Sequence, residues 1–102
     1  MGLYTNTGSN NPGNLLAQVT IANPVKGTWN SAIMPAISIT AGAKYWIAVL
    51  GPIGSGIVGF RDVSSGAQAQ TSAQNSLSSL PATWSPGANY SNSCMSAYLS
   101  KN

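Results

Sequence analysis

Short runs of apolar, β-branched and aromatic residues alternate along this chain with clusters of Gly, Pro, Asn and Ser. Runs of this length between turn-forming residues predict β-strands, and the spacing of a helix is hard to find. Strands are predicted at residues 2–5, 15–22, 28–34, 37–40, 44–50, 57–63 and 94–99. The pattern therefore predicts an all-β, antiparallel fold.

The strongest predicted strand is residues 44–50, where one lysine precedes six apolar or aromatic residues. Such a continuous run indicates a strand covered on both faces, as in the centre of a sandwich. Residues 52–56 are rich in Pro and Gly, so we expect residues 57–63 to return antiparallel to it. Residues 64–92 are mostly polar and predict an ordered loop or weak edge strand, anchored to the core by isolated large apolar residues. These anchors are Leu77, Leu80, Trp84 and Tyr90.

The composition is poor in charge, since 5% of the 102 residues are charged against about 25% in an average domain. Uncharged polar residues take their place, which is typical of extracellular or cell-surface β-proteins, and three Trp and four Tyr argue against disorder. The length fits one domain, residues 1–102. Cys94 is the only cysteine, so an internal disulfide is excluded. It is typical of a small buried residue, and in a secreted chain it can also cross-link two copies.

Charge and hydropathy also limit the partners. The net charge of +3 comes from four separated cations without a basic run, so nucleic-acid binding is not expected. No apolar run reaches 18 residues, so no membrane-spanning helix is predicted. The first residues lack the basic and apolar regions of a signal peptide, so an extracellular location implies a mature form or a segment of a longer chain.

Ionisable side chains for catalysis are scarce, because the chain has no His and no Glu, and Asp62 is its single carboxylate. A carboxylate pair for glycoside cleavage is therefore excluded. A serine nucleophile would need a lysine as its base, which leaves an atypical hydrolase with a Ser or Lys nucleophile as one alternative. Residues 54–59 match G-x-G-x-x-G, but a strand rather than a helix is predicted after them, so they indicate a hairpin turn and no nucleotide cofactor. Asp62 is a weak candidate for a structural calcium ligand, and no other metal is expected.

The aromatic residues are the remaining candidates for ligand binding. Aromatic rings supply flat surfaces for sugar rings, and Asn and Gln amides bind hydroxyl groups, so such a site needs no charge. Trp46 lies inside the continuous apolar run and is predicted to be core. Trp29 and Trp84 lie beside turn residues, and together with Tyr90 they are the predicted ligand-binding residues. Asn89-Tyr90-Ser91 is also an N-glycosylation sequon.

Six segments of the chain carry a more specific pattern: Leu15-Leu16-Ala17, Thr28-Trp29-Asn30, residues 39–49, residues 59–62, residues 80–84 and Ser96-Ala97-Tyr98. Together they resemble the jelly-roll accessory domains of bacterial secreted and cell-surface proteins, an uncharacterised family found beside glycoside hydrolase modules. The resemblance implies a jelly-roll-like β-sandwich and adhesion or carbohydrate association rather than catalysis. Members of this family have further strands ahead of the segment that corresponds to Gly2. The chain is therefore expected to be incomplete at its N-terminus and to complete its sheets by self-association, as a homo-oligomer.

The sequence thus predicts a non-catalytic extracellular binding or surface-association module, with carbohydrate as the favoured ligand. A purely structural, self-assembling domain is the first alternative, and the atypical hydrolase is the second.

Overall fold

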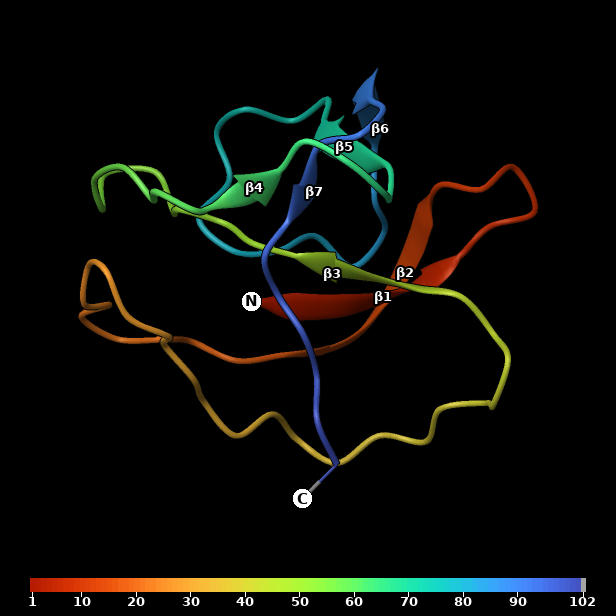
Figure 1. Ribbon diagram of the computed structural model, residues 1–102, viewed down its shortest axis with the longest axis horizontal. Coiled ribbons are helices and arrows are strands. Elements are labelled where there is room, and N and C mark those ends of the chain that lie inside the picture. The colour runs from red at the N-terminus through yellow and green to blue at the C-terminus, as the bar shows by residue number, and fades with distance from the viewer. Residues whose placement is uncertain (102) are drawn as a thin grey trace.

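The computed structural model describes residues 1–101, so the last residue of the predicted domain lies outside the described part. Strands are the regular elements of that part and all their pairings are antiparallel, which confirms the all-β prediction (Figure 1). They are β1 (Gly2–Asn6), β2 (Pro12–Gln18), β3 (Tyr45–Ala48), β4 (Asp62–Val63), β5 (Ala69–Ser72), β6 (Pro86–Tyr90) and β7 (Cys94–Met95). Within residues 1–101, no helix has the length and apolar character that a membrane crossing needs.

The largest sheet has the strand order β2-β1-β3, with β1 in the middle. Leu3 of β1 lies opposite both Ala17 of β2 and Ile47 of β3. β3 is an edge strand, so the prediction of a central strand at residues 44–50 is wrong. The reason is that residues 57–63 do not return along β3. Their last two residues form β4, which pairs with β7 instead.

Tyr4 is the centre of the core and has no exposed surface. Its ring meets that of Trp84 edge-on, with 5.4 Å between the centroids, and its hydroxyl donates to the backbone carbonyl of Pro81 at 2.7 Å. Burial raises the pKa of Tyr4 above its ordinary value, because a buried phenolate would lose its hydration. Ala48 and Leu80 complete the buried cluster, against which Trp84 packs. The predicted anchoring of the long polar segment is thus confirmed for Leu80 and Trp84.

Residues 20–44 contain no strand, so the strands predicted at residues 28–34 and 37–40 are wrong. The side chain of Asn30 forms hydrogen bonds with backbone groups that would otherwise be available for strand pairing. Its carboxamide accepts from the Val25 N–H at 2.7 Å and donates to the Val25 carbonyl at 2.9 Å. Such bonds compete with strand pairing. The segment forms the wide loop at the bottom of Figure 1.

Two smaller sheets, β5 with β6 and β4 with β7, complete the described fold. The residues ahead of β6 are tied to β2 by backbone bonds: the Trp84 N–H donates to the Gly13 carbonyl at 2.9 Å, and the Leu15 N–H donates to the Ala82 carbonyl at 2.8 Å. These bonds place β5 and β6 beside the main sheet. The jelly-roll arrangement of the sheets stays a prediction.

Candidate functional site

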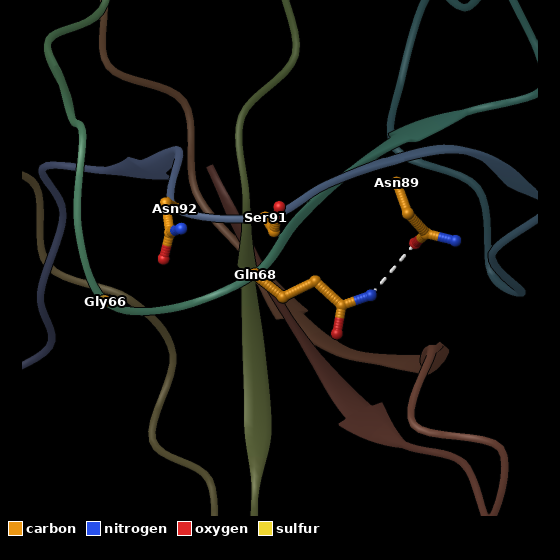
Figure 2. Close-up of a pocket in the computed structure, with 5 residues that line it drawn as sticks. All are labelled: Gly66, Gln68, Asn89, Ser91 and Asn92. Atoms are coloured by element: carbon orange, nitrogen blue, oxygen red, sulfur yellow. Dashed lines mark hydrogen bonds between the residues drawn. The ribbon is translucent and has the colours of Figure 1, made fainter.

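A cavity of about 340 Å³, wide open to solvent, lies beside the β5–β6 pair. Its lining is made of small and polar uncharged residues, none of which carries an ionisable side chain. They are Gly66, Gln68, Asn89, Ser91 and Asn92 (Figure 2). A wall of carboxamides and a hydroxyl, without a charge, suits a neutral ligand with many hydroxyl groups.

The pairing of β5 with β6 brings the carboxamides of this wall together. Gln70 lies opposite Asn89 across the two strands, so their side chains share one face. Gln68 comes two residues before Gln70 and projects to that same face, because side chains alternate along an extended chain. Tyr90 follows Asn89 directly and therefore projects to the other face.

A chain of hydrogen bonds begins at Lys44 and ends at Asn89. The Lys44 ammonium donates to Asn10 Oδ1 at 2.6 Å, and Asn10 Nδ2 donates to Gln68 Oε1 at 3.2 Å. Gln68 Nε2 then donates to Asn89 Oδ1 at 3.0 Å (Figure 2). Because an ammonium group can only donate, it fixes the orientation of each carboxamide that follows. The Lys44 ammonium also lies 4.6 Å from the ring centroid of Trp46, a cation–π contact that holds the start of the chain.

A second chain of hydrogen bonds begins at the indole of Trp84. Trp84 Nε1 donates to Gln70 Oε1 at 2.8 Å. Gln70 Nε2 donates to Asn89 Oδ1 and to Asn11 Oδ1, both at 2.7 Å. The indole N–H is also donor-only, so it fixes the orientation of Gln70. Two independent chains thus require the oxygen of Asn89 to face Gln68 and Gln70.

The hydrogen bonds link five carboxamides that we name the amide cluster: Asn10, Asn11, Gln68, Gln70 and Asn89. The oxygen of Asn89 accepts two bonds, which uses both of its lone pairs. Its Nδ2 hydrogens have no acceptor among residues 1–101. The two chains fix the orientation of the Asn89 carboxamide, so the direction of the Nδ2 donor is fixed as well. Asn89 therefore offers a donor for a ligand oxygen.

The backbone around the cavity depends on Gly87 within β6 and on Asn92 in the turn after it. A Cβ atom at Gly87 would lie 2.6 Å from the carbonyl oxygen of Thr71 and 2.9 Å from that of Ser72, so glycine permits the close approach of β6 to β5. After β6 the chain turns at Asn92, whose φ of 55° is a conformation that Asn adopts more readily than most residues. This turn follows Ser91, and both residues line the cavity.

Trp84 and Tyr90, two of the predicted ligand-binding residues, have different places in this region. Trp84 is half-buried against the core and does not line the cavity, but its indole N–H orients Gln70. Tyr90 is exposed and lies on the face of β6 opposite Asn89. Neither ring is part of the cavity wall.

Trp29, the third predicted ligand-binding residue, lies in the wide loop. The residue is 67% exposed, and its ring meets Tyr98 edge-on with 5.3 Å between the centroids. Within residues 1–101, no ring contact joins any two of Trp29, Trp84 and Tyr90. The structure therefore does not assemble the three predicted aromatic residues into one platform.

Ionisable groups are not gathered around the cavity. Asp62, the weak calcium candidate, is exposed on β4, and its Oδ2 accepts a hydrogen bond from the Ser93 hydroxyl at 3.2 Å. In the described residues, no group of three or more His, Cys, Asp or Glu is placed to hold a metal ion. Cys94 is free and half-buried. Calcium binding at Asp62 stays a prediction.

Sequence reasoning did not single out Gln68 and Gln70, nor the side chain of Asn89 as part of a binding surface. A signal exists in the sequence, because Gln68-Ala69-Gln70 has the two-residue spacing of one strand face. It lies in a segment whose polar composition predicts a loop or a weak edge strand. The pairing of Gln70 with Asn89, 19 positions further on, becomes visible only in the folded chain.

Comparison of the chain with models of protein families, with curated proteins and with solved structures gave no match. The resemblance to jelly-roll accessory domains therefore stays a prediction, and the functional argument depends on the geometry of the amide cluster and its cavity.

Proposed function

We propose that this chain is a non-catalytic binding module for a neutral carbohydrate, which binds in the cavity beside the amide cluster. The observation that supports this proposal is a 340 Å³ cavity lined by carboxamides and a serine, with an oriented donor at Asn89 Nδ2 that has no acceptor among residues 1–101. Extracellular or cell-surface action, which the composition predicts, is part of the proposal.

The chemistry of the wall favours sugars over charged ligands. A sugar hydroxyl or ring oxygen accepts from Asn89 Nδ2, and Ser91 and Asn92 supply a hydroxyl and a further carboxamide. An anion would find no cation in the wall, and a cation would find no carboxylate. A serine nucleophile would find no lysine there either, so the cavity offers no support for the hydrolase alternative.

The test is a titration of ¹⁵N-labelled protein with three neutral probes: cellohexaose, xylohexaose and mannohexaose. With at least one probe, we expect the side-chain amide signals of Gln68 and Asn89 to shift. The indole signal of Trp84 is expected to shift as well, because Gln70 connects that indole to Asn89. The indole signal of Trp29 serves as the internal reference and is expected to stay in place.

Two variants separate the site from general effects. Asn89→Ala removes the donor and is expected to weaken binding at least tenfold, whereas Gln74→Ala removes a carboxamide outside the cavity and is expected to leave binding unchanged. Binding is expected to be constant between pH 5 and pH 9, since no residue of the wall titrates. Equal affinity of Asn89→Ala and the unchanged protein, or no shift with any probe, would contradict the proposal.

The second candidate function is a structural, self-assembling domain, in which further copies complete the jelly-roll sandwich as a homo-oligomer. Large apolar side chains that are mostly exposed favour it, among them Ile57, which is fully exposed, and Phe60 at 66%. Exposed apolar surface of this kind marks interaction sites in soluble proteins.

A further inference from the structure

The outer edge of β3 is an open strand edge. β3 pairs only with β1 in the described chain, although Tyr45, Trp46 and Ile47 make it strongly apolar. All three residues are partly buried, and Trp46 packs against the core. Proteins normally protect such an edge with charges, proline or a bulge, because its free N–H and C=O groups accept another strand. The nearest charge, Lys44, is bound to Asn10 and therefore does not protect the edge.

An apolar arm, residues 53–60, continues from the end of β3 and adds to this surface. Ile57 is fully exposed, and Ile53 and Phe60 are 62% and 66% exposed. The arm is the green loop on the left of Figure 1. It turns tightly, with the Ser55 N–H donating to the Pro52 carbonyl at 3.0 Å, but it does not pair with β3. Edge and arm therefore form one continuous stretch of chain, in which β3 contributes an unpaired backbone edge and the arm contributes exposed apolar side chains.

The solvent-accessible surface of the chain is larger than expected for a monomeric protein of its mass. The chain exposes 7230 Å². A monomeric protein of 10.4 kDa is expected to expose about 5,400 Å², so the excess is about 1,800 Å². Each partner in a standard interface buries about 800 Å², and obligate dimers bury more. The excess is distributed over the whole chain, the wide loop included, and it exceeds the area that one partner of a dimer needs to bury.

From these observations we infer that a second copy of this chain docks on β3 and the apolar arm, with the two β3 strands antiparallel across a twofold axis. A register centred on Ile47 sets Trp46 opposite Ala48 of the second copy, a large ring against a small side chain. The same register sets Lys44 opposite Leu50 of the second copy, so no like charges face each other. The product is a continuous six-stranded sheet with the order β2-β1-β3-β3-β1-β2. This inference goes beyond sugar binding and does not depend on it, because the amide-lined cavity lies at β5 and β6.

The first test is the mass of the full chain by sedimentation between 1 and 100 μM. We expect a dimer, and we expect the double variant Ile57→Lys with Phe60→Lys to raise the dimer Kd at least tenfold. Both residues are exposed in the single chain, so the variant is expected to keep the circular dichroism spectrum of the unchanged protein. Ile33→Lys is the matched control, since Ile33 is 81% exposed but lies in the wide loop. It is expected to leave the Kd unchanged.

The second test probes the register. Ile47→Cys in a Cys94→Ser background is expected to cross-link into a covalent dimer with a short bis-thiol reagent, whereas Ile33→Cys in the same background is not. A monomer at 100 μM would overturn the inference and assign the edge to a different partner. A dimer that resists the lysine pair and does not cross-link at position 47 would overturn it as well.

Discussion

The main sheet and the wide loop contain similar numbers of large apolar residues, but the sheet buries residues that the loop would leave exposed to solvent. In the sheet, Tyr4 has no exposed surface, and Leu3 is 2% exposed. In the loop, Trp29 is 67% exposed and Ile39 is 66% exposed. Apolar residues are therefore not sufficient to form a core.

Strand pairing explains the difference. β1 has a partner on each side, and the segment around Leu80 packs on the resulting surface. In the loop, the carboxamide of Asn30 binds the backbone of Val25, so the chain closes on itself. A segment without strand partners cannot hold its side chains in a common layer, whatever their hydropathy. Four substitutions test this contrast, from the largest expected effect to the smallest.

Tyr4→Ala is expected to lower the free energy of unfolding by about 3–5 kcal/mol, the range for deleting a buried aromatic ring. The change removes the ring contact with Trp84 and the hydroxyl bond to Pro81. Urea denaturation followed by circular dichroism measures it. Tyr98→Ala, at a ring that is 66% exposed, is the matched control and is expected to cost about 0.5 kcal/mol or less. If both variants lost the same free energy of unfolding, the difference between the buried sheet and the exposed rings would be contradicted.

Gly87→Ala is expected to lower the free energy of unfolding by about 1–3 kcal/mol, the range for overpacking. The new Cβ would meet backbone atoms of Thr71 and Ser72, which cannot move aside as a side chain can. Gly8→Ala is the control, because a Cβ there meets nothing within 4 Å. Thermal unfolding of both variants measures the difference. If the two melt at the same temperature, the close approach of β6 to β5 is not needed for stability.

Tyr4→Phe is expected to cost about 1 kcal/mol at pH 7, because it removes one hydrogen bond and keeps the ring. Since the folded pKa of Tyr4 is raised above 10.0, its contribution is complete below pH 10 and is lost as the pH rises toward the folded pKa. Phenylalanine does not titrate, so the stability gap between variant and unchanged protein is expected to shrink above pH 10. Urea denaturation at pH 7, 9 and 11 measures the gap. A gap that widens with pH would contradict the prediction.

Ile33→Thr is expected to change the free energy of unfolding by about 0.5 kcal/mol or less, as for most exposed positions. Ile33 is 81% exposed in the wide loop, so the substitution removes little packing. Urea denaturation at a protein concentration below that of any dimer measures it for the single chain. A loss of the size found for Tyr4→Ala would mean that the loop is part of the core.

Sequence patterns predicted the fold class and some strands, but not the pairing. Residues 2–5 were expected as a strand and lie within β1, whereas residues 94–99 yield a strand only at Cys94–Met95. The apolar run at residues 44–50 does form β3, but its place at the sheet edge depends on whether residues 57–63 pair with it. The hydropathy pattern indicates which residues tend to be buried, but it does not indicate which strands pair with one another. Long-range pairing therefore escaped prediction.

The candidate site was predicted only in its chemistry. Amide side chains were expected in a binding site, and three of the five residues that line the cavity carry one, but the aromatic residues expected beside them lie elsewhere. Sugar binding by these amides stays a prediction. Trp84 belongs to the core because Tyr4 offers it a ring partner, and Tyr90 is on the other face of β6. The amide cluster depends on Lys44 and Asn10, which are 34 positions apart in the sequence. Contacts over such separations are set by the folded chain.

The free nitrogen of Asn89 has a practical consequence for protein production. Asn89-Tyr90-Ser91 is an acceptor sequence for oligosaccharyltransferase, which attaches its glycan to the asparagine Nδ2. That atom has no acceptor among residues 1–101. We therefore expect material secreted from a eukaryotic host to carry a glycan on this lining residue of the cavity, and material made in a bacterial cytoplasm to lack it.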